Sequence, residues 1–477
     1  MAEKSASDED FSRLRQCLVA VAVSLLPFAQ GAVAGWPSPM LPLLQSPASP
    51  LDGGPLTDEE ASRVGSLTCV AALLAVPVFS HLATRGSRKV AGYLAAAPLL
   101  PSWLAVALGS TRTSLYLARL AAGVCCAGGT VVVPLFLAEV AHDSVRGALS
   151  TISVLFFNSG ILFVYCAGSS LGYRALAWAC LALAPLFAAG FALVPESPVY
   201  LVSRGRTAAA VRAVMGLQAV GPERAGEVVG RLQGRSHVEA GLLEVLSTRA
   251  TLRGLAVGLG LCLNQQMSGL FAVLSYTVSI FQDAGTSLSP YTATMLVGAL
   301  QILGTCLSTA LVDRAGRRAL LVGSNCCMAA CLGCLGGYLY LARGAEVARF
   351  TWVPVAAVLG FILAVSVGPG ALCFLVVSEV FSERARAAAT TLCLCVLWAL
   401  MFLVGRTFSA VSLLVGAHGC FWLFAACSAA GAVFAATCVP ETRNRSLESI
   451  LRELGGGRGE LRDSGQPLRE KQLVARA

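Results

Sequence analysis

The chain has 477 residues, of which 56% are hydrophobic and 13% are charged, and its mean hydropathy is +0.72. A soluble protein has about a quarter of its residues charged, so this composition excludes a mostly water-exposed surface and predicts an integral membrane protein. The net charge of +9 comes from Lys and Arg that lie in loops between apolar segments, which does not indicate a nucleic-acid partner.

Twelve apolar runs follow along the chain, each near the roughly twenty residues that a helix needs to cross a hydrocarbon layer of ~30 Å. The first begins near Cys17, and the others occupy about 64–82, 90–109, 114–138, 150–168, 175–194, 254–281, 290–312, 320–341, 351–377, 387–409 and 415–438. A polar stretch separates the first six from the last six. Its Ala, Val and Leu recur among Arg and Glu, which predicts short amphipathic helices at the membrane surface.

The loop charges predict the orientation of the spans. Lys and Arg are concentrated in both terminal segments, in the central polar stretch and in alternate loops, as expected of cytoplasmic segments, whereas the opposite loops and adjoining helix ends hold fewer, among them Arg119. The first run lacks the cleavage site of a removable signal peptide and is expected to be a span. We therefore expect a cytoplasmic tail at 1–13, six helices at 14–194, a cytoplasmic linker with short helices at 195–253, six helices at 254–438 and a cytoplasmic tail at 439–477.

The two halves of the chain share charged landmarks. Glu139 precedes Arg146 by seven residues, and Glu379 precedes Arg386 by the same seven. Two shorter matches are Pro195-Glu196-Ser197 with Pro440-Glu441-Thr442, and Arg85-Gly86-Ser87-Arg88-Lys89 with Arg314-Ala315-Gly316-Arg317-Arg318. These matches indicate an internal duplication. Opposite charges at a membrane face can pair strongly, so pairs that break as the halves move would act as a latch; the alternative is ordinary flanking charge.

The cysteines and histidines do not point to a metal or to catalysis. Most of the 18 cysteines lie in apolar runs, and the CxxC of Cys331 and Cys334 is surrounded by Met, Ala, Leu and Gly, which favours packing over a zinc site. None of the four histidines is expected deep in a span beside a carboxylate or a serine. We therefore expect no metal, no cofactor and no enzyme activity.

Several motifs together resemble the sugar porter family of the major facilitator superfamily, over about 12–452. They are Asp313-Arg314-Ala315-Gly316-Arg317-Arg318, Val133-Pro134-Leu135-Phe136-Leu137-Ala138-Glu139, Pro195-Glu196-Ser197-Pro198, Gln265-Gln266-Met267-Ser268-Gly269 and Pro440-Glu441-Thr442. Gly35-Trp36-Pro37-Ser38-Pro39 is similar to the insect facilitated trehalose transporter branch. The resemblance implies an all-α membrane protein with twelve transmembrane helices in two six-helix bundles, the major facilitator fold, which rock around a central site.

The resemblance also implies a cytoplasmic latch between the halves. Its residues would be Glu139, Arg146, Glu196, Asp313, Gly316, Arg317, Arg318, Glu379, Arg386 and Glu441. The first half departs from the family pattern, with Ala83 in place of Asp and Ser87 in place of Arg. We therefore expect its latch to be weaker than that of the second half.

A sugar site calls for amides, which both donate and accept hydrogen bonds, and for an aromatic plate. Polar amides in a span are costly unless they face a cavity or pair with a neighbouring helix, so substrate contact and interhelical bonding are the two interpretations. The expected substrate residues are Gln265, Gln266, Gln301, Trp398 and Asn158. Phe271, Leu372 and Val154 replace polar or aromatic residues that the family carries, which indicates a less polar site than a hexose transporter has.

Conformational change and coupling can also be predicted. Gly368-Pro369-Gly370 interrupts the tenth run, because Pro removes a backbone hydrogen bond and Gly eases bending, and the family uses this region for gating. A proton symporter needs a carboxylate inside the membrane, and the first span has none, which favours uniport.

We therefore expect a monomer in the plasma membrane that carries a sugar, trehalose or a hexose, by facilitated diffusion and alternating access. Its partners would be the sugar and the lipid bilayer, with no nucleic acid. The alternatives are a transport-inactive sugar sensor or receptor and a proton-coupled sugar symporter.

Overall fold

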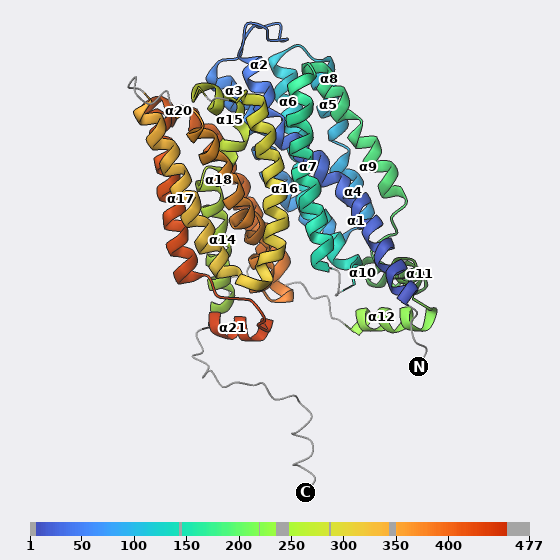
Figure 1. Cartoon of the computed structure of the whole chain (residues 1–477). Coiled ribbons are helices and arrows are strands. Elements are labelled where there is room, and N and C mark those ends of the chain that lie inside the picture. Colours follow the sequence, from blue (N-terminus) through green and yellow to red (C-terminus); the bar gives the residue numbers. More distant parts are fainter. Residues whose placement is uncertain are drawn as a thin grey trace.

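The computed structural model of the chain describes residues 6–142, 146–218, 220–234, 248–285, 288–342 and 350–455, and every regular element in these ranges is a helix (Figure 1). Eleven helical stretches within them are long and apolar enough to cross a membrane. The predicted runs therefore appear as helices, and one long stretch accounts for two of them.

The first half forms six spans, three of them built from two consecutive helices. They are α1 (Ala6–Gly35) with α2 (Pro37–Leu44), α3 (Asp58–Arg85), α4 (Arg88–Ala96) with α5 (Leu99–Leu108), α6 (Arg112–Val140), α7 (Arg146–Ser170), and α8 (Tyr173–Leu181) with α9 (Leu183–Ala192). Three short helices follow in the linker: α10 (Pro198–Ser203), α11 (Thr207–Gln218) and α12 (Pro222–Gly234).

The second half repeats this arrangement. Its helices are α14 (Arg249–Met267) with α15 (Leu270–Asp283), α16 (Pro290–Ala315), α17 (Arg317–Leu341), α18 (Val353–Val367) with α19 (Pro369–Val380), the long α20 (Glu383–Cys438), and the short α21 (Leu447–Gly455).

The long helix α20 holds the last two spans. It has 56 residues, roughly 80 Å of helix, which is more than twice the thickness of a hydrocarbon layer. Gly416 interrupts it with φ 77° and ψ 159°, a conformation that favours glycine. The residues just outside its two ends lie close together, because Thr442 donates a hydrogen bond to Glu379 at 2.6 Å. The helix therefore crosses and returns, and the chain has twelve transmembrane helices.

Side-chain caps explain where several spans begin. Thr57 forms a capping box with Glu60 at the start of α3, and Ser87, Thr111 and Ser289 each accept a hydrogen bond from a backbone amide in the first turn of α4, α6 and α16. Such caps satisfy amides that have no partner inside the helix, which matters most where the chain meets the membrane.

Small residues bring the spans of the first half close together. A side chain at Gly31 of α1 would meet the backbone oxygen of Phe157 in α7, and one at Gly160 of α7 would meet that of Phe28 in α1. Glycine therefore lets the two backbones touch, as in other membrane helix pairs. The two halves face each other mainly through α3 against α20, α7 against α16 and α2 against α15.

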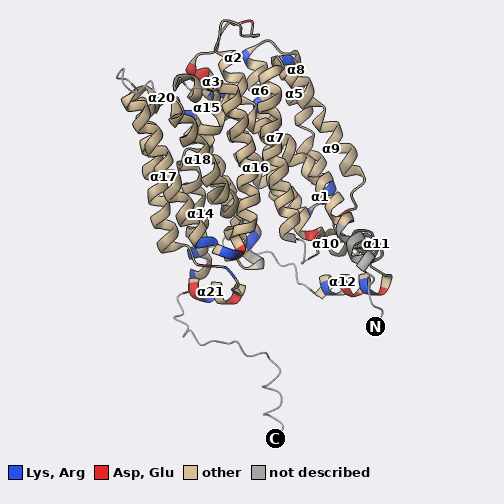
Figure 2. Ribbon diagram, viewed as in Figure 1, with Lys and Arg blue, Asp and Glu red and all other residues tan. Residues whose placement is uncertain are grey.

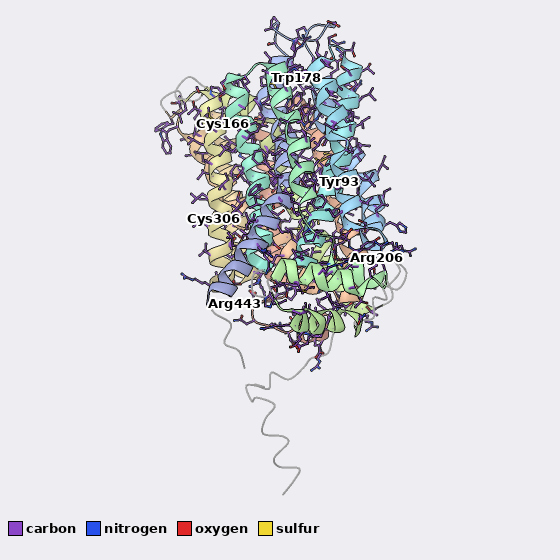
Figure 3. All side chains as sticks on the ribbon, turned by 90° about the vertical axis from the view of Figure 1, so that its right-hand side faces the viewer. Tyr93, Cys166, Trp178, Arg206, Cys306 and Arg443 are labelled. Carbon is purple, nitrogen blue, oxygen red and sulfur yellow. The ribbon has the colours of Figure 1, made fainter. Side chains whose placement is uncertain are left out.

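Charged residues gather at the two ends of the bundle, while the surface between them is almost entirely uncharged (Figure 2). We call the end that carries α10, α11, α12 and α21 the lower end, and the opposite end, with α2, the upper end (Figure 1). Many large apolar side chains are exposed, and the exposed Trp178 and Cys306 lie on the side of the bundle (Figure 3). This apolar exterior is what a bilayer requires of a multi-pass protein.

Candidate functional site

Two adjacent amides lie where the seventh span changes from α14 to α15. Gln265 and Gln266 are both buried near the end of α14, and Ser268 donates a hydrogen bond back to the carbonyl of Gln265 at 2.8 Å. Gly269 then takes φ 82°, a left-handed conformation that ends one helix and starts the next. A side chain there would lie 2.4 Å from the ring of Phe424. Position 269 therefore requires glycine, both for its left-handed backbone and for the space beside Phe424.

A third amide side chain, that of Asn158, joins the two halves. Asn158 of α7 donates to Thr305 of α16 at 2.8 Å and approaches the carbonyl of Gln301 at 3.5 Å. Thr305 donates to the same carbonyl at 2.9 Å. Asn158 and Gln301 were both predicted to contact substrate, and the structure brings these two together across the interface between the halves. Gln265, Gln266 and Trp398 lie on α14 and α20.

Four of the five predicted substrate residues hold a buried polar atom with no hydrogen-bond partner among the described residues. These atoms are Oε1 of Gln265, Oε1 of Gln266, Oε1 of Gln301 and Nε1 of Trp398. Each residue is at most 8% exposed. An unsatisfied buried polar group costs about 1–3 kcal/mol and is rare in native proteins. These unsatisfied atoms are three acceptors and one donor.

Carboxylates organise the lower end of the first half. Glu139 accepts three hydrogen bonds from Arg88, the shortest at 2.8 Å, and a further one from Ser197. Glu196 accepts hydrogen bonds from Ser87 and from the backbone amide of Ser197. Arg88 and Glu139 are 7% and 10% exposed, so this ion pair is well shielded from water.

The second half repeats the pattern with different partners. Arg317 pairs with Glu379 at 3.1 Å and with Asp313 at 3.2 Å, and Thr442 donates to Glu379. Glu441 accepts from the backbone amides of Arg317 and Arg318, each at 3.1 Å.

Glu441 is held ionised by these amides. Burial would raise its pKa, but hydrogen bonds from four backbone amides, those of Arg443, Arg317, Arg318 and Thr442, outweigh burial and lower the pKa below its usual 4.5. Gly316 has φ 88°, and a side chain there would lie 2.7 Å from the Glu441 carboxylate, so glycine is needed for this approach.

These lower-end pairs all form within one half. The side chain of Arg146 lies outside the described residues, and Arg386 donates to the carbonyl of Phe381 at 3.4 Å. Glu139 and Glu379 are thus engaged by Arg88 and Arg317 of their own halves. The predicted latch across the halves stays a prediction.

Polar contacts between the halves lie at the upper end and also nearer the lower end, where the hydroxyls of Ser80 and Thr391 are 2.6 Å apart. Glu59 of α3 accepts from Arg406 of α20 at 3.0 Å and from Arg63 at 2.6 Å. The buried Ser62 donates to the carbonyl of Gly405 at 3.0 Å, and the amide of Val278 donates to Ser38 at 3.3 Å. The upper ends of the two halves are therefore held together by polar contacts.

Sequence reasoning misplaced or missed three residues. Arg119, expected near an outer helix end, lies about two turns inside α6 and is 4% exposed. It donates to the carbonyls of Val64 and Val33 and lies 5.3 Å from the centroid of the Trp36 ring. Arg88 resembles an ordinary flanking charge in the sequence, and Ser87 a departure from the family pattern, yet Arg88 binds Glu139 and Ser87 binds Glu196. The internal repeat held a signal for Arg88, because it places Arg88 opposite Arg317. Ser87 stands opposite Gly316 there, so the repeat gave no such signal for Ser87.

The predicted break in the tenth span is present. Helix α18 ends at Val367 and α19 begins at Pro369, with Gly368 at φ −102° and ψ −109° between them. A side chain at Gly368 would meet the hydroxyl of Ser324 at 1.8 Å, so α17 approaches the break closely. Its role in gating stays a prediction. Within the described part of the chain, no group of three or more His, Cys, Asp or Glu is arranged to hold a metal ion.

Curated relatives cover nearly the whole chain. It is 32% identical over 446 residues to the facilitated trehalose transporter Tret1 of Culex quinquefasciatus, which covers 92% of this chain and 86% of that protein. The Tret1 of Aedes aegypti is 32% identical over 450 residues, and the chain spans about half of that longer protein, 55%.

Solved structures and a family model agree on the fold. The proton:xylose symporter XylE, a major facilitator superfamily protein, aligns with a TM-score of 0.71 at 22% identity, over 93% of this chain and 98% of that one. A partially occluded inward-open XylE from E. coli aligns with a TM-score of 0.72 at 21% identity, over 91% of this chain and 99% of that one. The family model described as sugar (and other) transporter matches residues 57–454, and the chain therefore belongs to this family of multi-pass membrane transporters with the major facilitator fold.

Proposed function

We propose that the chain is a facilitative transporter that carries a sugar, trehalose or a hexose, across a membrane by alternating access of its two halves. The unpartnered buried amides carry this proposal. Gln265, Gln266 and Gln301 each present a carbonyl oxygen that has no partner among the described residues, and Trp398 presents an unpartnered N–H. A sugar hydroxyl donates and accepts at the same atom, so one polyol can satisfy all four groups.

Trehalose is the favoured substrate among sugars because the relatives named above are facilitated trehalose transporters. The site has fewer polar groups than its family pattern, with Phe271 partly buried beside Gly405. A second sugar ring would supply apolar faces for such a lining. A hexose remains the alternative within the same class.

The movement of the halves is proposed from the contacts between them. The upper ends are joined through Glu59–Arg406 and Ser62–Gly405, whereas the lower-end clusters of Glu139 and Glu379 hold each half together internally. Breaking the upper contacts would open the site to that side. The breaks at Gly269 and Gly368 lie within spans, where helices can bend as the halves rock.

Uniport is proposed over proton coupling because of where the carboxylates lie. Glu139, Asp313 and Glu379 are at the lower end of their spans, in or next to arginine clusters. The buried charge deep in the first half is Arg119, a group that stays protonated and so does not carry a proton through a cycle. The structural neighbours named as proton symporters are below 25% identity and support the fold alone.

We also propose the placement of the protein. The lower end, with its Lys and Arg, would face the cytoplasm, so that both termini are cytoplasmic and the upper end faces outward. The membrane would be the plasma membrane, and the protein would act as a monomer without enzyme activity. The five parts expected from the sequence, two tails, two six-helix bundles and a linker, are proposed with the same boundaries.

Uptake of labelled trehalose, glucose and fructose into oocytes that express the chain tests the proposal, at neutral and acidic external pH. We expect saturable uptake of at least one sugar without accumulation above the external concentration. Gln265→Ala is expected to raise the half-saturation constant about 5- to 150-fold, because it leaves a buried sugar hydroxyl without its partner, which costs about 1–3 kcal/mol.

Gln16→Ala, at a buried glutamine near the lower end, is the matched control and should leave the half-saturation constant unchanged. No uptake of any sugar despite surface expression would favour a sensor instead. Accumulation driven by acidic pH would favour a symporter.

A further inference from the structure

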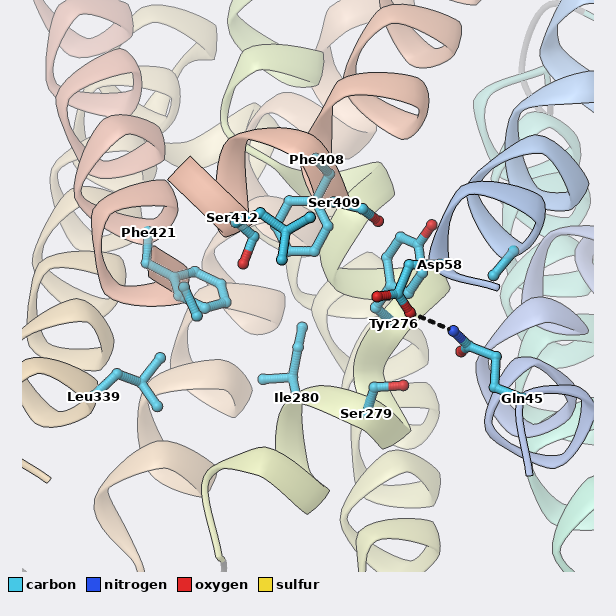
Figure 4. Close-up of a pocket in the computed structure, with 13 residues that line it drawn as sticks. Gln45, Asp58, Tyr276, Ser279, Ile280, Leu339, Phe408, Ser409, Ser412 and Phe421 are labelled. Atoms are coloured by element: carbon cyan, nitrogen blue, oxygen red, sulfur yellow. Dashed lines mark hydrogen bonds between the residues drawn. The ribbon is translucent and has the colours of Figure 1, made fainter. Parts of the chain in front are cut away.

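A pocket of about 220 Å³ lies at the upper end, away from the predicted substrate amides (Figure 4). Its walls come from both halves: Gln45 and Asp58 belong to the first, while Tyr276 and Ser279 of α15 and Phe408, Ser409 and Ser412 of α20 belong to the second. Gln265, Gln301 and Trp398 do not line it. The pocket is therefore a separate space from the proposed transport site.

The polar groups of this pocket are only partly used. Gln45 donates to Oδ1 of Asp58 at 2.8 Å, which leaves the second carboxylate oxygen available (Figure 4). Tyr276 is 9% exposed, and its hydroxyl makes no hydrogen bond of full geometry with the described residues, although it interacts with the hydroxyl of Ser409 in the same pocket. A buried phenol whose hydrogen bonding is incomplete is costly, and together with the free oxygen of Asp58 it points to a ligand that the pocket would hold.

Aromatic rings supply the other half of the lining. The ring of Tyr276 stacks on that of Phe408 with centroids 5.4 Å apart and planes 24° apart, and Phe408 stacks in turn on Phe424 at 6.2 Å. Phe421 closes a further side of the pocket. Flat apolar faces next to a carboxylate and several hydroxyls match a molecule that has hydroxyls on its edge and C–H groups on its faces.

The size and the charge of the pocket restrict the ligand. Sites for drug-sized ligands have about 300–1,000 Å³, so 220 Å³ suits a single sugar ring and is too small for two. The Asp58 carboxylate disfavours an anion. A cation would use the carboxylate and the hydroxyl oxygens of Ser279, Ser409 and Ser412, but it would leave the hydrogens of these hydroxyls without an acceptor, which a polyol supplies.

We propose that this pocket is a second sugar site, which binds a single-ring polyol at the outer face while the upper ends of the halves are together. This proposal rests on the proposed function in one respect only, which is that the upper end of the protein faces outward. The carboxylate of Asp58 and the hydroxyl of Tyr276 bind hydroxyl groups of the ring, and the stacked ring of Tyr276 lies against the C–H face.

Ligand-observed saturation-transfer NMR on the purified full chain tests this, with D-glucose and trehalose as probes. The measurements are made in the Gln265→Ala background, in which sugar binding at the central site is weakened. We expect glucose to keep a saturable signal there. Tyr276→Phe, which removes one oxygen, and Asp58→Asn should each lower it at least threefold, and the signal of trehalose should be weak.

Two matched substitutions outside the pocket serve as controls. Tyr340→Phe changes an exposed tyrosine of α17, and Asp52→Asn changes an exposed carboxylate of the outer loop. Neither should alter the glucose signal. Ser412→Leu narrows the pocket but leaves Tyr276 and Asp58 in place. It should also abolish the glucose signal, because the ring no longer fits. This result would show that the signal needs the space of the pocket as well as single hydrogen bonds.

The proposal is overturned if the glucose signal in the Gln265→Ala background is absent or survives all three pocket substitutions. It is also overturned if choline displaces glucose from the pocket at equal concentration, which would identify a cation site. Failure of the transport proposal gives a different result: uptake is then absent, while the NMR signal still depends on Tyr276 and Asp58.

Discussion

Glu139→Gln removes the charge on which Arg88 and Ser197 converge, and the cost of this change can be derived from the structure. The two charged side chains are 7% and 10% exposed. Removing one partner of a buried ion pair costs about 3–5 kcal/mol, because the other charge stays buried without compensation. Arg88 also donates to the carbonyls of Gly86 and Thr84, which retain part of its bonding, so we expect about 3 kcal/mol.

The assay is thermal unfolding of the purified protein, compared at one heating rate. An unfolding entropy of about 2.1 cal/mol/K per residue turns 1 kcal/mol into roughly 1 °C for 477 residues, so the expected loss in Tm is roughly 3 °C. Asp313→Asn is the matched control, since Asp313 pairs with an arginine but is 80% exposed. It should cost less than about 1 kcal/mol.

A double substitution tests whether the lost stability comes from leaving the charge of Arg88 buried without a partner. Arg88→Met in the Glu139→Gln background removes the uncompensated charge, so it should recover part of the lost stability. Equal losses for Glu139→Gln and Asp313→Asn would refute the reasoning from burial. So would a double variant whose loss is the sum of the two single losses.

Three further predictions follow from other parts of the molecule. Gly269→Ala should lower the free energy of unfolding by at least about 1–2 kcal/mol, because Gly269 has a left-handed φ of 82°, and the contact with Phe424 should lower it further. Gly285→Ala is the control, since Gly285 has φ 59° and no atom within 4 Å of an added side chain. Its loss in Tm should be smaller, and the difference measures the contact with Phe424. Glu59→Gln removes an exposed carboxylate that joins the halves at the upper end. Because an exposed ion pair is weak, the ratio of outward to inward half-saturation constants should change at most about fivefold. Salt screens such a pair, so a change that persists in high salt would contradict this explanation. Glu441→Gln should be less stable than wild type at neutral pH. Because folding lowers the pKa of Glu441, this difference should shrink as pH falls below 4.5, and a difference independent of pH would be evidence against the amide hydrogen bonds.

Much of the fold could be predicted because the bilayer acts on local sequence. A span needs a run of apolar residues, and such runs are visible without knowledge of any contact. The twelve runs were recognised this way, the linker helices from their recurring Ala, Val and Leu, and the break at Gly368 from its Gly and Pro. The structure has helices or a break at each. The boundary near Gly416 was also expected, and Gly416 interrupts α20 there with a non-helical conformation.

The site was only partly predictable, because partners lie far apart in the chain. Glu139 was recognised from a repeated spacing, but its partner Arg88 is 51 residues away and looked like flanking charge. Arg119 looked like a residue at a helix end, since hydropathy does not reveal that its guanidinium reaches backbone carbonyls of two other helices. The pocket beside Tyr276 had no signal in the sequence at all, because its walls come from four separate helices and the loop after α2.

The sequence by itself determined the class of protein, the number of spans and the positions of the charged landmarks, since each depends on composition or on spacing along the chain. The tertiary structure decided which charges pair, which amides remain without a partner and where the two halves touch. These properties arise when helices pack against each other, and hydrogen bonding and burial then depend on neighbours that no local pattern specifies.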